Sequence, residues 1–150
     1  MKPNALGSLL VLLQFGLLAG LAGLCLWQAR TQLPGPLSLA LWAASAALGG
    51  WTLLVNRPGN FNIHPAPRAD GHLVQDGPYR WVRHPMYASV LLLAAGAAVW
   101  LPPGVGALLW LALLAVLLVK AGLEERWLLQ RYPAYAAYRQ RSWRLLPWVY

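Results

Sequence analysis

Apolar positions gather into four long segments, separated by shorter polar or turn-rich stretches. The segments run over about Ala5–Trp27, Leu37–Val55, Tyr87–Leu101 and Val105–Val119. The first two are close to the roughly 20 residues that a helix needs to cross about 30 Å of hydrocarbon. The pattern therefore predicts an all-α integral membrane protein with about four transmembrane helices.

The last two segments form a predicted helical hairpin. Residues 102–104 are Pro-Pro-Gly, which cannot continue a helix smoothly and predict a tight turn between antiparallel helices. After Val105, good helix formers continue without a breaker until Pro133. We therefore expect one helix from about Val105 to Tyr132, whose last turns project into water.

Composition and charge agree with a membrane protein and give it an orientation. The chain is 59% hydrophobic and 11% charged, with a net charge of +8. With four crossings, one face of the membrane carries Lys2, the basic residues of 57–83 and those from Lys120 onward. The other face carries Arg30. The positive-inside rule then places both termini in the cytoplasm. This placement of the basic residues argues against a nucleic-acid partner, and we expect a multi-pass protein of a bacterial inner membrane.

The chain is expected to form a single membrane domain. Residues 1–58 would supply two N-terminal transmembrane helices, and residues 59–150 a polar loop, the hairpin and an interfacial C-terminal helix. All acidic residues and all histidines fall on the predicted cytoplasmic face. Chemistry is therefore expected at that boundary, and the many Gly and Ala residues leave an oligomer open.

The first candidate cluster is the run of residues 76–87, which ends where the third apolar segment begins. Pro85 suits the first turn of a helix, and a helix N-terminus favours an anion such as a carboxylate. Arg83 and His84 add hydrogen-bond donors at the same place. The alternative is that the basic residues anchor the protein at the interface and the aromatic residues form a belt there.

The second candidate cluster comprises Lys120, Glu124 and Glu125. Lys120 and Glu124 are four residues apart and share a helix face. One carboxylate would face a cationic or hydroxyl-bearing ligand. Equally, the segment could be a solvated helical extension in which Glu124 pairs with Lys120, and Glu125 with Arg126 or Arg131.

A third cluster follows, in which Tyr135 and Tyr138 share one face of a short amphipathic helix. This helix is expected to lie on the headgroups, and it could also cap a site beneath it. A metal site is not predicted, because the chain has a single cysteine and its histidines lack close ligand spacing.

The run Arg83-His84-Pro85-Met86-Tyr87, followed by Glu124-Glu125 and the tyrosine tail, resembles the isoprenylcysteine carboxyl methyltransferase and phospholipid methyltransferase superfamily. The resemblance covers about Gly71 to Pro147 and implies a cytoplasmic pocket for S-adenosyl-L-methionine. It places on cofactor-contacting positions Gly71, His72, Leu73, Val74, Tyr79, His84, Pro85, Met86, Tyr87, Glu124 and Glu125. It also makes Lys120, Arg83 and Glu124 the catalytic candidates.

Lys120 falls where the carboxyl methyltransferases carry an arginine that meets the substrate. Lysine keeps the charge but loses the bidentate fork, so the acceptor remains open among carboxylate, amine and thiol. Arg83 and His84 would suit the carboxylate of the cofactor, and Glu124 or Glu125 its ammonium or ribose hydroxyls. Aromatic faces of Tyr79, Trp81 or Tyr87 would attract the sulfonium.

The sequence thus predicts methyl transfer from S-adenosyl-L-methionine to a lipophilic acceptor, either an isoprenylcysteine carboxylate or a lipid amine. Two alternatives stand beside it. The first is a nicotinamide-dependent membrane reductase of the sterol reductase type, although Ala88-Ser89 occupies the place where those enzymes carry an acidic residue. The second is a non-enzymatic membrane protein whose polar face binds a partner or an anionic lipid.

Overall fold

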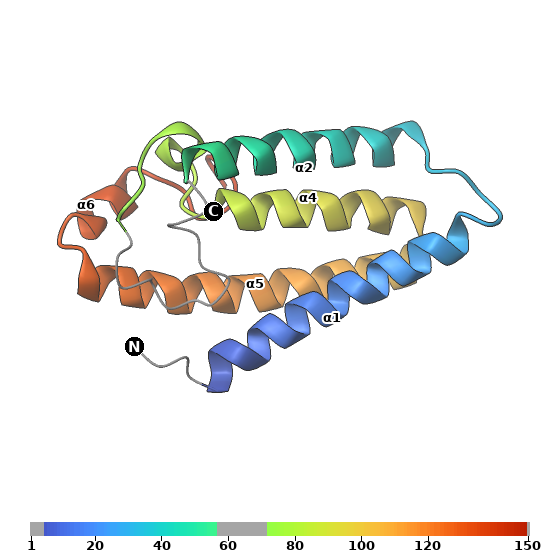
Figure 1. The fold of residues 1–150 in the computed structure, drawn as a ribbon, viewed down its shortest axis with the longest axis horizontal. Coiled ribbons are helices and arrows are strands. Elements are labelled where there is room, and N and C mark those ends of the chain that lie inside the picture. The colour runs from blue at the N-terminus through green and yellow to red at the C-terminus, as the bar shows by residue number, and fades with distance from the viewer. Residues whose placement is uncertain (1–4, 57–71, 150) are drawn as a thin grey trace.

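The computed structural model describes residues 5–56 and 72–149, whose regular elements are all helical (Figure 1). Their bounds in chain order are α1 Ala5–Gln28, α2 Pro36–Val55, the 3-10 helix η1 Gly77–Arg80, α4 Pro85–Trp100, α5 Pro103–Arg131 and α6 Tyr135–Gln140. Among the described residues, α1, α2 and α5 are long and apolar enough to cross a membrane, and α4 is a shorter apolar helix of 16 residues. The predicted all-α membrane architecture is confirmed.

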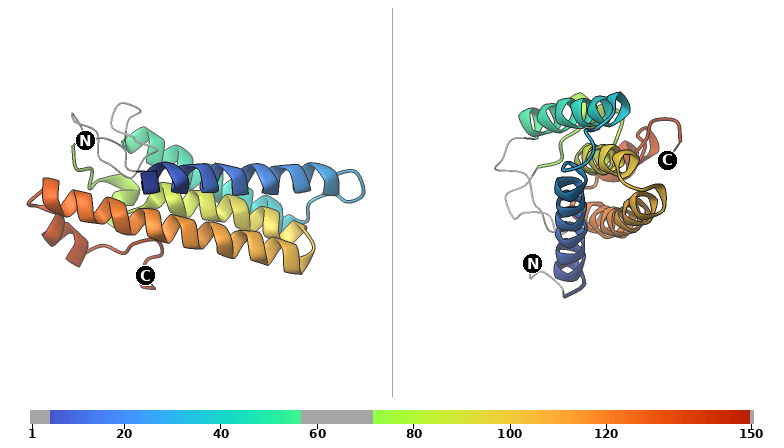
Figure 2. Two further views of the ribbon diagram at one scale, coloured as in Figure 1. Left: turned by 90° about the horizontal axis from the view of Figure 1, so that it is seen from below. Right: turned by 90° about the vertical axis from the view of Figure 1, so that its right-hand side faces the viewer.

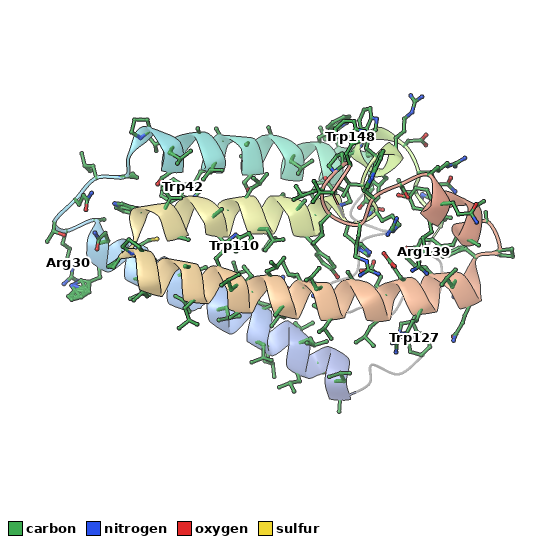
Figure 3. The ribbon with its side chains drawn as sticks, turned by 180° about the vertical axis from the view of Figure 1, so that it is seen from behind. Arg30, Trp42, Trp110, Trp127, Arg139 and Trp148 are labelled. Carbon is green, nitrogen blue, oxygen red and sulfur yellow. The ribbon has the colours of Figure 1, made fainter. Side chains whose placement is uncertain are left out.

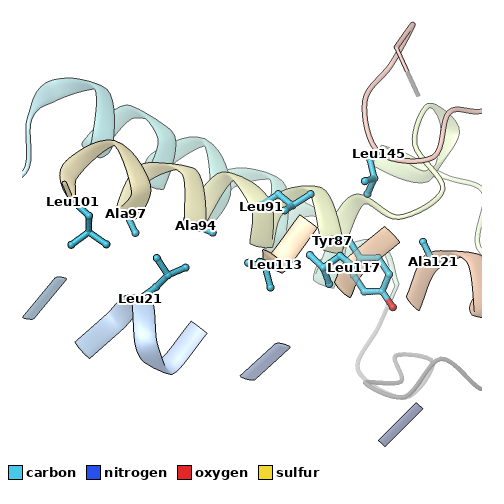
Figure 4. Packing of buried hydrophobic residues seen from close by; sticks show 10 residues of the cluster. All are labelled: Leu21, Tyr87, Leu91, Ala94, Ala97, Leu101, Leu113, Leu117, Ala121 and Leu145. Atoms are coloured by element: carbon cyan, nitrogen blue, oxygen red, sulfur yellow. The ribbon is translucent and has the colours of Figure 1, made fainter. Parts of the chain in front are cut away.

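Helix α4 is the central element of the bundle. The view along the bundle in Figure 2 shows α4 between α2 on one side and α1 and α5 on the other. The core contains Leu113, Leu117 and Ala121 of α5, each fully buried against α4. Figure 4 shows this row of apolar side chains along the α4–α5 contact, with Leu21 of α1 packed against its far end. Many outward-facing leucines remain exposed, as expected where lipid covers the surface.

Helices α2 and α4 pack closely because small residues line their contact. A Cβ atom on Gly96 would meet the indole ring of Trp42 at 2.5 Å, so only glycine fits there. The same indole donates a hydrogen bond from Nε1 to the carbonyl oxygen of Leu93 at 3.1 Å. Nearer the other end, the hydroxyl of Ser45 donates to the carbonyl oxygen of Ser89 at 2.7 Å. Close approach and interhelical hydrogen bonds of this kind hold membrane helices together.

The hairpin of α4 and α5 has the predicted tight turn. Helix α5 begins at Pro103 and ends at Arg131, within two residues of the predicted bounds. A helix of 29 residues is longer than the hydrocarbon layer at about 1.5 Å per residue, so its last turns extend beyond the apolar layer. Pro85 occupies the first turn of α4, as predicted, and the structure places His84 at the N-cap position.

The polar segments lie at one end of the bundle, whereas Arg30 lies at the other (Figures 1 and 3). The end of α2, the start of α4, the end of α5 and all of α6 meet there. For the described basic residues, this arrangement is the one that their spacing predicted, whereas Lys2, Arg57 and Arg68 lie outside the described residues. Assignment of that end to the cytoplasm stays a prediction.

Candidate active site

Two clusters that are far apart in the sequence meet at the polar end of the bundle. The carboxylate oxygen Oε2 of Glu124 accepts a hydrogen bond from the hydroxyl of Tyr87 at 2.9 Å. The same oxygen lies 3.5 Å from Nδ1 of His84, whose ring stacks on that of Tyr87 with centroids 5.3 Å apart. Lys120 places its Nζ atom 5.3 Å from the centre of the Tyr87 ring. We call these four residues, His84, Tyr87, Lys120 and Glu124, the Glu124 cluster.

The Glu124 carboxylate is open to solvent on one side. Its side chain is 32% exposed, the largest exposure in the cluster, since the side chain of His84 is at 3% and Lys120 is at 1%. Within the part of the chain that the structure describes, Oε1 of Glu124 accepts no hydrogen bond. A half-open carboxylate beside buried polar groups can accept a hydrogen bond from, or pair with the charge of, a ligand.

Glu125, one residue later, is buried among basic side chains, and its own side chain is 3% exposed. Its Oε1 atom accepts hydrogen bonds from Nε of Arg83 at 2.9 Å, Nε2 of His84 at 3.3 Å and Nε of Arg144 at 3.1 Å. Its Oε2 atom accepts a hydrogen bond from Nη2 of Arg144 at 3.0 Å and lies 3.7 Å from Nε of Arg139. We call Glu125 and these four partners the Glu125 ion network.

The ion network joins three separate parts of the chain. Arg83 and His84 precede α4, and Glu125 belongs to α5. Arg139 and Arg144 come from residues 132–149, which follow α5 and which we call the C-terminal segment, or tail. Figure 3 shows this crowded polar end, with Arg139 labelled beside α5. The interpretation of this segment as a solvated helix, with Glu125 paired to Arg126 or Arg131, is therefore wrong. The carboxylate is buried, and its basic partners come from distant positions.

The C-terminal segment is fixed over the start of α4 by its backbone as well. The N–H of Arg83 donates to the carbonyl of Trp143 at 2.8 Å, and that of His84 donates to the carbonyl of Arg144 at 3.1 Å. Trp143 returns a bond from its own N–H to the carbonyl of Trp81 at 2.9 Å. These bonds form a short parallel bridge between Val82 and Trp143. The C-terminal segment thus fixes the backbone from which the His84 side chain extends.

Helix α6 contacts the protein rather than lying free on the surface. Tyr135 and Tyr138 are almost fully buried, at 1% and 2% exposure. The hydroxyl of Tyr138 donates to the carbonyl oxygen of Tyr79 in η1 at 2.6 Å. Of the two roles that the sequence left open, this packing favours the capping role.

Arg83 has a different environment from the one expected for a ligand donor. Its guanidinium bonds Glu125, the carbonyl oxygen of Arg139 at 3.1 Å and the carbonyl oxygen of Ser142. With its side chain 9% exposed, it holds the tail against Glu125. This geometry favours a positioning role over direct contact with a cofactor carboxylate.

The remaining predicted residues are placed as follows. Tyr79 accepts a hydrogen bond at its hydroxyl from Asn56 at 2.9 Å, and burial, together with the charge of Glu124, raises its pKa. Pro85 lines a cavity described below, and the Met86 sulfur accepts a contact from the hydroxyl of Ser89 at 3.6 Å. His72 is exposed, Leu73 and Val74 are half-buried, and Gly71 lies outside the described residues.

Gln14 of α1 was missed in the sequence analysis. Its amide oxygen accepts a hydrogen bond from Nζ of Lys120 at 2.5 Å, although the two residues are 106 positions apart. A lone polar side chain in the middle of an apolar span was the available signal. Such residues in membrane helices usually face the bundle interior and a partner.

An apolar cavity of about 750 Å³ lies on another side of the α4–α5 contact. It is lined by α2, α4, α5, the η1 region and the C-terminal segment, with Trp110 and Trp148 among its walls (Figure 3). Within the described residues, its lining includes no member of α1 or of the Glu124 cluster. A cavity of this size and lining suits a hydrocarbon group.

His84 is the titratable group that both carboxylates share. Burial alone lowers its pKa, but hydrogen bonds to Glu124 and Glu125 and their charges raise it by more, so the pKa lies above its usual value. The imidazolium form is favoured because a neutral ring can donate from only one of its two nitrogens.

Stability should therefore depend on pH through His84. The stability that its charge adds is fully present below the unfolded pKa of 6.5 and is lost as pH rises through the raised folded value. Unfolding of wild-type protein and of His84→Gln, measured in detergent from pH 5.5 to 9, should differ most at the acidic end. A difference that stays constant or grows with pH would contradict this assignment.

Together, the helices and the polar end define a helical membrane protein with ionisable groups gathered at one end of its bundle. Comparison with families of known proteins matches residues 59–135 to the family described as phospholipid methyltransferase. The match spans just over half of the chain and includes η1, α4 and α5. This chain belongs to the phospholipid methyltransferase family, which implies a methyltransferase that acts on lipid-like substrates of the membrane. No curated protein matches it in a separate search.

Proposed function

We propose that this protein transfers methyl groups from S-adenosyl-L-methionine to a lipophilic acceptor at the end of the bundle that carries Glu124. The observation that carries the proposal is the half-open Glu124 carboxylate. Tyr87 and His84 hold its Oε2 atom, while Oε1 accepts no hydrogen bond from any described residue. The family match also includes all four residues of the Glu124 cluster.

The chemistry of these residues fits such a cofactor. S-adenosyl-L-methionine carries an ammonium group and ribose hydroxyls, and Oε1 of Glu124 can accept a hydrogen bond from either. The Tyr87 ring already contacts His84 on one face and has Lys120 over it, so Tyr79 is the better aromatic neighbour for the sulfonium. We assign Glu124 and Tyr79 to the cofactor, and Tyr87 and His84 to orienting Glu124.

When bound, S-adenosyl-L-methionine supplies an electrophilic methyl group for an in-line displacement. The residues of the chain orient the reactants and exclude water, which can lower the barrier substantially. Lys120 is assigned to an anionic group of the acceptor. The Glu125 ion network holds the C-terminal segment over the start of α4, which keeps His84 and therefore Glu124 in place.

A lipophilic acceptor is supported by the apolar surroundings. Three described helices have the length and hydropathy of membrane spans, and the cavity of about 750 Å³ offers room for a hydrocarbon group near the same end. A lipid amine and an isoprenylcysteine carboxylate both satisfy these conditions. The dense basic residues at this end favour a cytoplasmic position for the reaction.

Binding of S-adenosyl-L-methionine to purified protein in detergent tests the proposal. Glu124→Gln removes the charge and keeps the shape, and it should weaken binding by about tenfold or more, as for loss of a charged hydrogen bond. Asp76→Asn is the matched control, because it makes the same change at an exposed carboxylate. Equal affinities for wild type and Glu124→Gln, or no binding by the wild type, would refute the proposed site.

The acceptor can be identified with the same preparation. Methyl-labelled S-adenosyl-L-methionine is supplied with nanodiscs containing phosphatidylethanolamine, or with N-acetyl-S-farnesylcysteine. Label on the phospholipid identifies a lipid amine as acceptor, and base-labile label on the cysteine derivative identifies a carboxylate. Absence of label on either would remove the support for these two acceptor classes.

A further inference from the structure

Helix α1 has one buried polar side chain in its apolar centre. Its buried residues are Gly7, Leu10, Gln14 and Leu21, spaced so that they form one face turned toward the bundle. Gln14 is 7% exposed, and an amide in such a place needs a hydrogen-bond partner because burial without one costs free energy. That partner is the ammonium group of Lys120.

Lys120 in turn is 1% exposed, in a helix that is otherwise apolar over most of its length. A buried charge in a membrane span is costly and is kept where it has partners. Within the described residues, its Nζ atom bonds the amide oxygen of Gln14 on α1 at 2.5 Å and lies 5.3 Å from the centre of the Tyr87 ring on α4. The position of the ammonium group therefore depends on α1 as well as on the hairpin.

The contacts form a continuous chain into the site. Gln14 bonds Lys120, Lys120 lies over Tyr87, and the hydroxyl of Tyr87 donates to Glu124 at 2.9 Å. Lys120 also stands one helical turn before Glu124 on α5. An error in the position of the ammonium group would therefore act on Lys120, the residue assigned to the acceptor, while Oε2 of Glu124 keeps its hydrogen bond from Tyr87.

We propose that Gln14 is a positioning residue of this site, which holds the ammonium group of Lys120 beside Tyr87 so that α1 forms part of the machinery for methyl transfer. The inference rests on the proposed function for its catalytic meaning. It goes beyond the family match, since residue 14 lies outside the matched residues 59–135.

A purely structural link between helices would also account for a hydrogen bond, so the test needs a readout that such a link does not move. Gln14→Leu should lower kcat/KM for the acceptor by about tenfold, while the dissociation constant for S-adenosyl-L-methionine changes less than about twofold. Gln14→Glu keeps an oxygen for the ammonium group and should restore most of the activity. Gln28→Leu makes the same change at the far end of α1, where the amide bonds Gln32, and should leave both quantities unchanged.

A spectroscopic readout separates this inference from the proposed function. Lys2 and Lys120 are the only lysines of the chain, so lysine labelled with ¹³C at its ε carbon gives two signals, which Lys2→Arg assigns. Gln14→Leu should shift the Lys120 signal and leave that of Lys2 in place, whether or not any acceptor is methylated. An unmoved Lys120 signal would overturn the pairing itself. A moved signal with wild-type kcat/KM, or without rescue by Gln14→Glu, would reduce Gln14 to a structural link and overturn the positioning role.

Discussion

Replacement of Glu125 by glutamine should destabilise the folded protein by about 3–5 kcal/mol, the usual cost of removing one partner from a buried ion pair. The carboxylate is 3% exposed and faces Arg83, His84, Arg139 and Arg144. Without its charge, the nearly buried Arg83 would keep a full positive charge beside a second arginine with no anion between them. For a chain of this size, the expected fall in Tm is on the order of 10 °C.

The tail should also loosen in Glu125→Gln. Arg144 loses both of its bonds to the carboxylate, so the segment that carries it is held only by its backbone bonds and apolar contacts. Limited trypsin digestion should then cut at Arg144 in the variant well before it does so in the wild type. Thermal unfolding in detergent and mass spectrometry of the fragments measure the two effects.

Asp76→Asn again provides the matched control, because it removes a carboxylate charge from an exposed position. Its Tm and its digestion pattern should equal those of the wild type. If Glu125→Gln also keeps the wild-type Tm, the network contributes little to stability, and the tail must be held by Trp143 and Leu145 instead.

The helices were predictable from sequence because lipid imposes a simple rule on them. A span must be apolar and long enough, and proline or glycine marks where it ends, so α1, α2 and α5 begin and end within two residues of their predicted bounds. The shared polar end followed from the number of crossings. Neither prediction depends on the rotation of each helix about its own axis.

The partners of each polar side chain depended on that rotation and were predicted less well. Glu124 and Glu125 are neighbours in sequence, but their side chains leave the helix about 100° apart. Glu124 therefore contacts Tyr87 and His84, whereas Glu125 contacts the basic residues of the ion network. The sequence identified both carboxylates as candidates but did not predict that they have different partners. It likewise counted Arg83 as a ligand donor, because the tail that occupies its guanidinium lies some 60 residues away.

Gln14 illustrates the same limit from the other direction. Its side chain was visible as a lone amide in an apolar segment, but its partner on α5 is 106 residues away. Only the packing of α1 across α5 brings the two together (Figure 1).

The hairpin turn leads to the second large expected effect, a loss of stability in Gly106→Ala. A Cβ atom at Gly106 would meet the backbone of Ala98, with its Cα atom at 2.8 Å and its carbonyl carbon at 2.9 Å, and its oxygen closer still. Backbone atoms cannot turn aside as a flexible side chain can. Because the connection between α4 and α5 is so short, the helices would have to separate at their joined ends, and we expect a cost of about 1–3 kcal/mol, as for other overpacked sites.

Gly104→Ala is an unusually direct control for this substitution. The two glycines lie in the first turns of the same helix, but a Cβ atom on Gly104 meets no atom within 4 Å. Alanine favours a helix over glycine by about 1 kcal/mol, so Gly104→Ala should keep or raise Tm while Gly106→Ala lowers it. Since both variants make the same chemical change, a difference in the sign of the Tm shift isolates the α4–α5 contact from helix propensity. Shifts of the same sign and size would mean that the hairpin does not close as tightly as the Ala98–Gly106 contact requires.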